Sequence, residues 1–310
     1  MFKYIMKRVT HIIIALFCIV TLTFGLMRIA PGNPFASEKK MPPAIQKQLN
    51  EAYGLDKPIH EQYLKYLGDV VRFDFGKSMK YKNRSTNKMI EESFPVSLTL
   101  GLEALFLSVG FGVLLGVLSA AYHNKFGDYM ATIIAVLGIS VPSFILAGLM
   151  QDILGLKLGW LPISGWKSFA HSIMPAFAIS LGFMGNIAKM VRSSMLEQNT
   201  SEYVKLARAK GLTKWKIVFK HSLRNALLPV VTYLGPLTAG VVTGSFIVEK
   251  IFAIPGLGKH FVTSISNRDY TVIMGTTIFY SILLLFAVLL VDILYMLVDP
   301  RIKLKGAKSS

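Results

Sequence analysis

Long apolar stretches alternate with polar segments along the chain, and six of them are long enough to cross a bilayer. A helix that spans the hydrocarbon core needs about 20 mostly apolar residues. The pattern therefore predicts an all-α membrane protein with six transmembrane helices. The predicted spans lie near Val9–Ile29, Val96–Tyr122, Tyr129–Leu154, Ile173–Val191, Pro229–Val248 and Val272–Leu297. The third and fourth are interrupted by Gly, Pro and polar residues.

The first apolar stretch resembles a secretory signal in its basic start, which contains Lys3, Lys7 and Arg8. It lacks a small-x-small cleavage site, and it is longer than the apolar region of a signal peptide. We therefore expect it to be a true transmembrane helix.

Basic residues in the connecting segments predict the orientation. The chain ends carry Lys3, Lys7 and Arg8 before the first span and four Lys or Arg residues after the last. The loop 196–228 carries seven Lys or Arg residues against two Glu residues. Because short cytoplasmic segments are enriched in Lys and Arg, both termini and this loop are expected in the cytoplasm of a bacterial cell.

These spans divide the chain into four parts. We expect a first transmembrane helix at 1–30, an extracytoplasmic insert at 31–95, a five-helix core at 96–298 and a cytoplasmic tail at 299–310. The loop 196–228 belongs to the core.

The insert is expected to be a small folded segment. Its Pro31-Gly32-Asn33-Pro34 sequence is turn material, and short helices are predicted at Gln48–Tyr53 and Glu61–Tyr66.

Composition supports a bilayer protein. Apolar residues make up 53% of the chain and charged residues 16%, and the mean hydropathy is +0.50; soluble domains have about 25% charged residues. The net charge of +17 fits basic cytoplasmic loops better than nucleic-acid binding. The single cysteine, Cys18, excludes an internal disulfide and a thiolate metal cluster.

Motifs of catalysis are missing from the sequence, which contains no HExxH, no GxSxG and no Cys/His cluster. Gly76-Lys77-Ser78 resembles the end of a phosphate loop, but Val71 stands where that loop needs its first glycine. We therefore expect a transport subunit rather than an enzyme, with no cofactor or metal bound by this chain.

The loop 196–228 contains a predicted helix–turn–helix. Residues 202–210 are mostly good helix formers, Gly211 fits the left-handed residue after a helix, and Thr213 fits the N-cap of a second helix. On the second helix one face combines Trp215, Val218, Phe219 and Ser222, and another combines Lys216, Lys220 and Arg224. Three interpretations compete: a solvated basic loop, a DNA-binding helix–turn–helix, and a docking knob for a cytoplasmic partner.

Glu202-Tyr203 followed by Ala207, Ala209 and Gly211 resembles the EAA loop of ABC importer permeases. In that family the short coupling helix of this loop sits in a groove of the ATPase subunit, which implies the same role here for these five residues and Leu212. The proline usual some thirteen residues after the glycine is replaced by Arg224, and a proline follows at Pro229. That departure is similar to the peptide/nickel branch, whose pattern resembles residues 208–229.

Shorter segments in the same order extend the resemblance over nearly the whole chain, and the B-type permease subunits of oligopeptide importers are the most similar. These segments are 28–34, 53–58, 74–78, 139–144, 254–258, 267–270 and 299–301.

The resemblance implies a type I ABC importer permease fold that forms half of a pathway for oligopeptides. It also implies a homologous second permease, two cytoplasmic ATPases that bind ATP and Mg, and an extracytoplasmic peptide-binding protein, but no nucleic acid. Dipeptides, nickel chelates and glutathione are alternative cargoes. An ion-coupled secondary transporter and a membrane-embedded enzyme are alternatives of other classes.

Glu103 is the candidate pathway residue. It lies about 10 Å inside the outer end of the second span at about 1.5 Å per residue, and Gly101, Ser108, Gly112, Gly116 and Ser119 lie on the opposite side of that helix. A carboxyl that faces lipid is costly, so both sides are expected to meet protein or water. A structural carboxyl is the alternative interpretation.

Overall fold

The fold is known from a computed structural model that describes residues 2–29 and 42–298. The described residues form helices joined by turns, with one isolated antiparallel bridge between Lys77 and Ser85 and no strand. The expected all-α architecture is therefore confirmed. The predicted turn Pro31-Gly32-Asn33-Pro34 and the segment at 299–301 lie outside the described residues.

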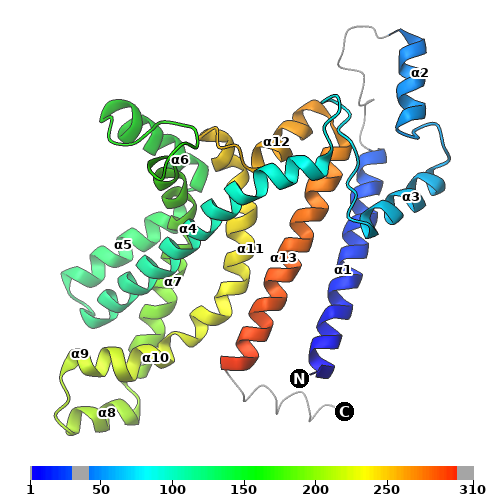
Figure 1. Cartoon of the computed structure of the whole chain (residues 1–310). Coiled ribbons are helices and arrows are strands. Elements are labelled where there is room, and N and C mark those ends of the chain that lie inside the picture. The colour runs from blue at the N-terminus through cyan, green and yellow to red at the C-terminus, as the bar shows by residue number, and fades with distance from the viewer. Residues whose placement is uncertain (1, 30–41, 299–310) are drawn as a thin grey trace. The chain divides into compact units, whose positions relative to one another are not determined.

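The helices drawn in Figure 1 belong to two compact units. Among the described residues, one unit consists of 2–29, 42–96 and 256–285, and the other of 97–255 and 286–298. We refer to them as the first and the second unit.

The first unit contains the predicted insert. Helices α2 (Pro43–Ala52) and α3 (Ile59–Val71) confirm the two short helices expected there. Helix α3 is anchored on α1 (Phe2–Ile29) by aromatic packing, since the ring of Phe24 lies 5.3 Å from that of Tyr63 and 5.6 Å from that of Tyr66. The hydroxyls of Thr21 and Tyr63 are 2.7 Å apart and share a hydrogen bond.

Asp269 organises the other part of the first unit. It is fully buried immediately before α13 (Tyr270–Val298), and it accepts hydrogen bonds from the Ser78 hydroxyl and from the Met79 backbone N–H at 3.1 Å. The Tyr53 hydroxyl donates to the Ser78 carbonyl at 2.7 Å. Burial, with a smaller contribution from the Asp269 carboxylate, raises the pKa of Tyr53. One carboxylate therefore ties the insert to α13. Helix α12 (Leu257–Asn267) precedes Asp269 and α13 in the sequence.

Helix α4 (Thr86–Ala121) begins in the first unit, and its part in the second unit, residues 97–121, packs on α7 (Ala170–Asn199) through its glycines. The expected packing face of α4 is buried at all five positions, Gly101, Ser108, Gly112, Gly116 and Ser119. A Cβ atom on Gly112 would lie 2.8 Å from Ile187, and one on Gly116 would lie 2.6 Å from Val191. The small-xxx-small pair therefore brings the two helices into close contact, as predicted.

The same close approach joins α5 (Phe126–Ser140) to α7. A Cβ atom on Gly138 would lie 2.6 Å from the Leu181 carbonyl oxygen, and one on Gly185 would lie 2.3 Å from the Ala135 carbonyl oxygen. Each helix therefore presents a glycine to the backbone of the other.

The third predicted span is not one straight helix. Helix α5 ends at Ser140, and α6 (Ser143–Met150) continues through the π-helical η1 (Gln151–Lys157) after a bend of 105°. The bend falls at Val141, which adopts an extended conformation before Pro142. A proline disfavours the helical conformation in the residue that precedes it, which explains the break.

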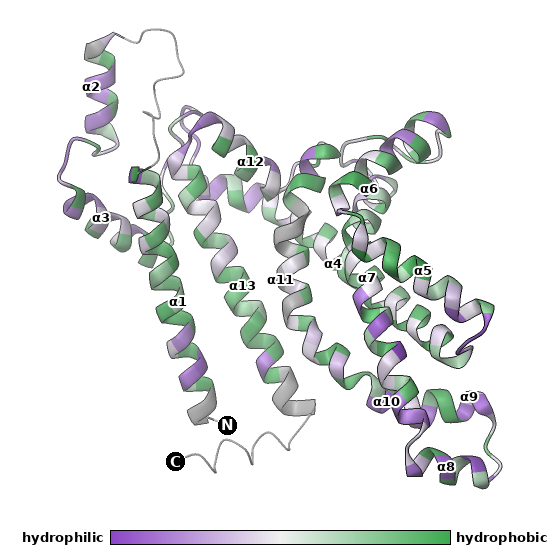
Figure 2. Ribbon diagram, turned by 180° about the vertical axis from the view of Figure 1, so that it is seen from behind, coloured by the Kyte–Doolittle hydropathy of each residue, from purple (hydrophilic) through white to green (hydrophobic). Residues whose placement is uncertain are grey.

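Four described helices are long and apolar enough to cross a membrane, and the bent pair makes a fifth candidate span. The four are α1, α4, α7 and α13. Helix α11 (Leu228–Ile251) covers the fifth predicted span and starts with Pro229 in its first turn, as expected. Several of its side chains lie outside the described part of the structure, so the count of six spans stays a prediction. Figure 2 shows apolar residues along α1 and α5 and polar ones on α2 and α8 (Glu202–Ala209).

The contact between α4 and α7 makes a specific prediction for Gly116→Ala. The added methyl has no room beside Val191, so the helices must separate, and overpacking of this kind costs about 1–3 kcal/mol. We expect a clearly lower midpoint of thermal unfolding for the purified chain in detergent.

Gly110→Ala is the matched control, since a Cβ atom at Gly110 of the same helix meets nothing within 4 Å. Because alanine has a higher helix propensity than glycine, this variant should leave the midpoint of thermal unfolding unchanged or slightly higher. Equal midpoints for the two variants would contradict the packing.

Candidate functional site

The candidate site is a helical hairpin that follows α7, and we call residues 202–226 the α8–α10 hairpin. It comprises α8, α9 (Lys214–Lys216), the π-helical η2 (Ile217–Ser222) and α10 (Leu223–Ala226). It lies at the opposite end of α7 from α6 (Figure 1).

The turn after α8 has the geometry predicted from Gly211. Its φ is +78°, the left-handed region that glycine enters without steric cost. The Gly211 N–H donates to the Arg208 carbonyl at 2.9 Å, and the Leu212 N–H donates to the Ala207 carbonyl at 3.3 Å. This pair of bonds is a Schellman motif, which satisfies two carbonyls at the end of the helix.

A small apolar cluster holds the hairpin together. Val204 and Ala207 on α8 are buried against Ile217, and Leu212 packs on the same cluster. Ala207 and Leu212 thus contribute to the apolar contact between the two arms of the hairpin.

Tyr203 fixes the hairpin to its neighbours. Its hydroxyl donates to Gln198 Oε1 at 2.6 Å and accepts from Asn225 Nδ2 at 3.0 Å. Ser222 donates to Asn199 Oδ1 at 3.0 Å. Polar bonds therefore join α8 and η2 to the last turn of α7, and α10 to α8.

The side of α8 opposite this cluster is exposed. Glu202, Leu206 and Ala209 are exposed there, and they lie within about 60° of each other at 100° per residue. Leu206 is 57% exposed and was not among the residues predicted from the sequence. Its spacing from Glu202 and Ala209 was the available signal. We call Glu202, Leu206 and Ala209 the outer stripe.

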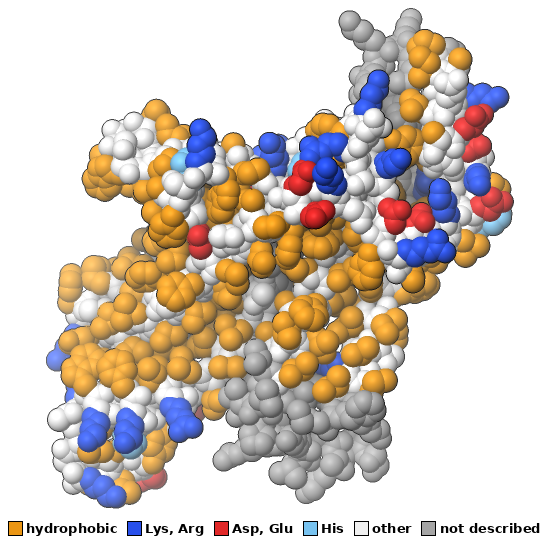
Figure 3. Space-filling view, in the orientation of Figure 1, with side chains coloured by type: hydrophobic (Ala, Val, Ile, Leu, Met, Phe, Trp, Pro, Cys, Tyr) orange, Lys and Arg blue, Asp and Glu red, His pale blue; other side chains and the backbone are white. Residues whose placement is uncertain are grey.

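Charge on the hairpin is mostly basic. Lys and Arg side chains stand out on its surface in Figure 3. Lys216, Lys220 and Arg224, which the spacing placed on one helix face, are all exposed. Glu202 pairs with Lys205 at 2.8 Å, but both side chains are well exposed, so this ion pair adds little stability.

The predicted apolar face of the second hairpin helix is partly buried and partly exposed. Val218 and Ser222 are buried, whereas Trp215 and Phe219 are exposed and stack with their ring centroids 5.7 Å apart. Thr213 precedes the helix with extended geometry, as expected for an N-cap, although its side chain makes no capping hydrogen bond.

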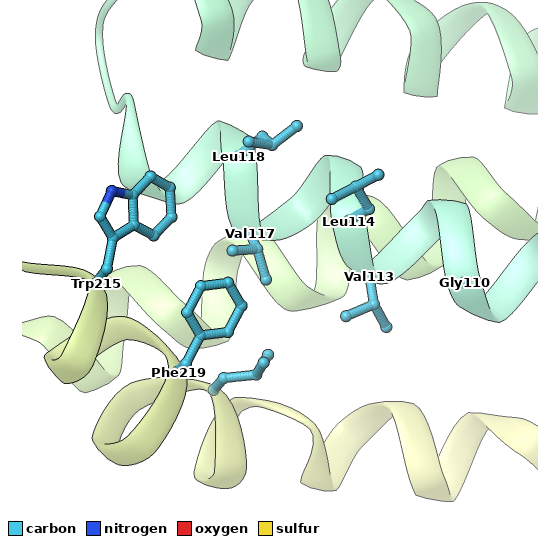
Figure 4. Close-up of a pocket in the computed structure, with 8 residues that line it drawn as sticks. Gly110, Val113, Leu114, Val117, Leu118, Trp215 and Phe219 are labelled. Carbon is cyan, nitrogen blue, oxygen red and sulfur yellow. The ribbon is translucent and has the colours of Figure 1, made fainter.

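An apolar groove separates Trp215 and Phe219 from α4. It has a volume of about 390 Å³ and is lined by Gly110, Val113, Leu114, Val117, Leu118, Trp215, Phe219 and Leu223. Figure 4 shows the two aromatic rings rising toward Val117 on α4. The hairpin is therefore only loosely packed against α4 here.

Glu103 lies away from the hairpin on α4. Its Oε2 atom is buried without a hydrogen-bond partner among the described residues. On the same side of α4, Phe106 is 77% and Leu114 51% exposed. This chain alone therefore leaves that side of the helix largely uncovered.

Residues that commonly bind metals do not gather in the described part of the chain. Across residues 2–29 and 42–298, no three His, Cys, Asp or Glu side chains lie close enough to hold an ion. The hairpin itself presents a basic surface and an exposed outer stripe.

Two family models together cover nearly the whole sequence. Residues 112–304 match the binding-protein-dependent transport system inner membrane component. Residues 1–101 match the N-terminal part of the binding-protein-dependent transport system membrane component. The chain belongs to this family. It is a permease, as the resemblance of the hairpin implied.

Curated relatives of the permease align over almost its full length. The dipeptide transport system permease protein DppB of Bacillus subtilis (strain 168) is 49% identical over 304 residues, which are 98% of this chain and 99% of that protein. The oligopeptide transport system permease protein OppB of Escherichia coli (strain K12) is 41% identical over 305 residues, 98% of this chain and 100% of that protein.

Solved structures support the expected fold. The MetNI methionine ABC transporter in an inward-facing conformation matches with a TM-score of 0.59 at 21% identity, over 68% of this chain and 96% of that chain. An amino acid ABC transporter crystallised with histidines matches with a TM-score of 0.54 at 15% identity, over 67% and 94%. The permease therefore has the fold of ABC importer membrane subunits.

The turn of the permease hairpin makes a specific prediction for Gly211→Val. A β-branched residue is strained at a φ of +78°, by about 1–2 kcal/mol or more. We expect the two Schellman hydrogen bonds to open, which hydrogen exchange would detect as faster exchange of the amides at 211 and 212.

Gly211→Asn is the control, because asparagine tolerates the left-handed conformation. It should leave exchange nearly at the wild-type rate. If Gly211→Val exchanged as slowly as Gly211→Asn, the left-handed turn would not be a requirement of the hairpin.

Proposed function

We propose that this permease forms half of the translocation pathway of an ATP-driven importer for peptides. ATP and Mg bind on separate ATPase subunits, and the permease carries no catalytic site. The observation that carries the proposal is the α8–α10 hairpin, a rigid basic projection with an uncovered outer stripe, in a chain whose full-length relatives are peptide permeases.

The outer stripe is the surface that docks on the ATPase. Ala209 allows close approach of the partner, Leu206 supplies an exposed apolar contact, and Glu202 supplies a charge. The shape of the hairpin that presents this surface is fixed by Tyr203, Ala207, Gly211 and Leu212. This division of roles refines the set that the sequence predicted.

A second, homologous permease completes the pathway, and two cytoplasmic ATPases and an extracytoplasmic binding protein complete the importer. The uncovered side of α4 around Phe106 and Leu114 suits a helix of the second permease. The basic hairpin and chain termini belong in the cytoplasm of a bacterial cell under the positive-inside rule.

Peptide length is a separate part of the proposal. Relatives named for dipeptide transport are 46–49% identical to this chain, and those named for oligopeptide transport are 40–41% identical. Both groups align over the whole chain, so short peptides are the proposed cargo class, with dipeptides and longer peptides as the two cases to compare.

Glu103 is the proposed pathway residue, which meets the amino terminus of the cargo. Its Oε2 is buried and makes no hydrogen bond among the described residues, so its hydrogen-bonding capacity is not used within them. A hydrogen bond to a charged group contributes about 1.5–3 kcal/mol. We expect Glu103→Gln to insert normally and to lower peptide uptake by about tenfold or more.

Glu91→Gln is the matched control, since Glu91 is an exposed glutamate on the same helix. Uptake is measured in vesicles across a range of pH. If Glu103→Gln imported peptides at the control rate at every pH, Glu103 would have a structural role only.

The proposed ATPase contact predicts the effect of Leu206→Asp. A charge at an exposed position leaves the hairpin folded, but it places an unpaired carboxylate in the docking surface. We expect association of the ATPases with the purified permease pair to fall by at least about tenfold, which corresponds to 1.4 kcal/mol, and ATP-driven uptake to fall with it.

Ile45→Asp makes the same change at an exposed isoleucine on α2 and should retain ATPase association. The importer function would be refuted by peptide uptake that persists without the ATPases. Normal association by Leu206→Asp would instead refute the outer stripe as the contact.

A further inference from the structure

A single buried carboxylate joins three elements of the second unit. Asp128, in the first turn of α5, is 3% exposed. Arg192 of α7 donates from Nε to Oδ1 at 2.7 Å and from Nη2 to Oδ2 at 2.9 Å. The Ser119 hydroxyl on α4 and the Asn124 backbone N–H in the intervening turn also donate to it, the latter at 2.9 Å. One side chain therefore holds α4, the α4–α5 turn and α7.

The turn between α4 and α5 is shaped around this carboxylate. Asn124 has a φ of +58°, a left-handed conformation that asparagine tolerates better than most residues. In this conformation its N–H points at Asp128 Oδ2, and His123 Nδ1 lies 3.2 Å from the same oxygen. Asp128 is buried and Arg192 is partly exposed, so loss of Arg192 leaves an uncompensated buried carboxylate, and the pair resists separation.

Arg192 also lies close to the hairpin along the chain. Helix α7 ends at Asn199, about two turns beyond Arg192 at 3.6 residues per turn, and α8 begins at Glu202. The hydrogen bonds of Tyr203 to Gln198 and of Ser222 to Asn199 fix the hairpin to that last turn. A displacement of α8 is therefore passed to α7, and through Arg192 to Asp128.

The direct link between the hairpin and α4 is weaker. Lys214 Nζ donates to the Ala121 carbonyl at 2.6 Å and lies 5.1 Å from the centre of the Tyr122 ring. Lys214 borders a cavity of about 420 Å³, and the next residue, Trp215, borders the apolar groove of about 390 Å³. A single lysine side chain with open space on both sides permits rotation, whereas the two-bond pair at Asp128 does not.

We propose that Asp128 and Arg192 are positioning residues that make α4, α5 and α7 move as one body when the hairpin is displaced. A movement imposed on α8 then reaches α4, the helix that carries Glu103. This inference rests on the proposed importer function. In this proposal the outer stripe receives the movement, and the ion pair between Asp128 and Arg192 transmits it to α4.

The test uses the complete importer in vesicles, with both permeases, the ATPases and the binding protein, and measures peptide uptake and ATP hydrolysis in the same sample. For Arg192→Gln we expect hydrolysis within about twofold of wild type and uptake per ATP lowered about tenfold, a size typical of coupling between sites. Arg192→Lys keeps the charge but lacks the two-donor fork of arginine. Its uptake per ATP hydrolysed should therefore lie between those of wild type and Arg192→Gln.

Asp152→Asn is the control, because Asp152 forms an exposed ion pair with Lys157 at 2.6 Å. Its uptake per ATP should equal that of wild type. A parallel fall of uptake and hydrolysis in the Arg192 variants, or an unchanged ratio, would overturn the inference. If Arg192→Gln fails to assemble, the same criterion applies to Arg192→Lys.

The wild-type sample separates the two levels of the proposal. If wild-type vesicles show no ATP-dependent uptake, the proposed function fails. If they show it and both Arg192 variants keep the wild-type ratio, only the role of the ion pair fails.

Discussion

Contact at backbone distance between α7 and its neighbours is the constraint on which the second unit depends. Lipid tails are as apolar as leucine, so helices in a bilayer gain little from burying apolar surface and associate largely through close packing. Gly112 and Gly116 of α4, and Gly138 and Gly185 at the α5–α7 contact, remove the Cβ atoms that would hold the helices apart. Polar bonds then fix the positions of the helices along each other. Ser108 donates to the Ala104 and Ser180 carbonyls within the same contact.

In the apolar part of α4, residues 96–121, the one carboxylate, Glu103, lies on the side opposite the glycines. The glycine side of α4 packs closely within the chain, whereas Phe106 on the other side is 77% exposed and Leu114 faces the apolar groove. An exposed apolar side of this kind suits the second permease of the proposed importer. The uncovered apolar surface of this chain is consistent with a protein neighbour and with lipid at different places along the same helix.

Much of this organisation was predictable from the sequence because it follows from local periodicity. The 3.6-residue repeat placed the glycine face of α4, and the chemistry of Gly211 predicted a left-handed turn. The break at Val141 was only partly visible, since a proline inside an apolar run can kink, end or merely bend a helix. Its neighbours in space decide among these outcomes, and the sequence does not show them.

Contacts between distant positions were beyond the sequence. Asp128 and Arg192 are 64 positions apart, and neither has a local pattern that marks it as paired. Leu206 was missed for a related reason: an amphipathic helix of eight residues has two candidate faces, and only the position of Ile217 shows which one turns inward.

The hairpin separates the residues that hold it together from those that it displays. Val204, Ala207, Leu212 and Ile217 form a closed cluster, and the outer stripe makes no part of it. Substitutions in the outer stripe can therefore accumulate during evolution without unfolding the hairpin or disturbing the helices behind it. Under the proposed function, the surface that docks on the ATPase can therefore vary independently of the residues that fold the hairpin.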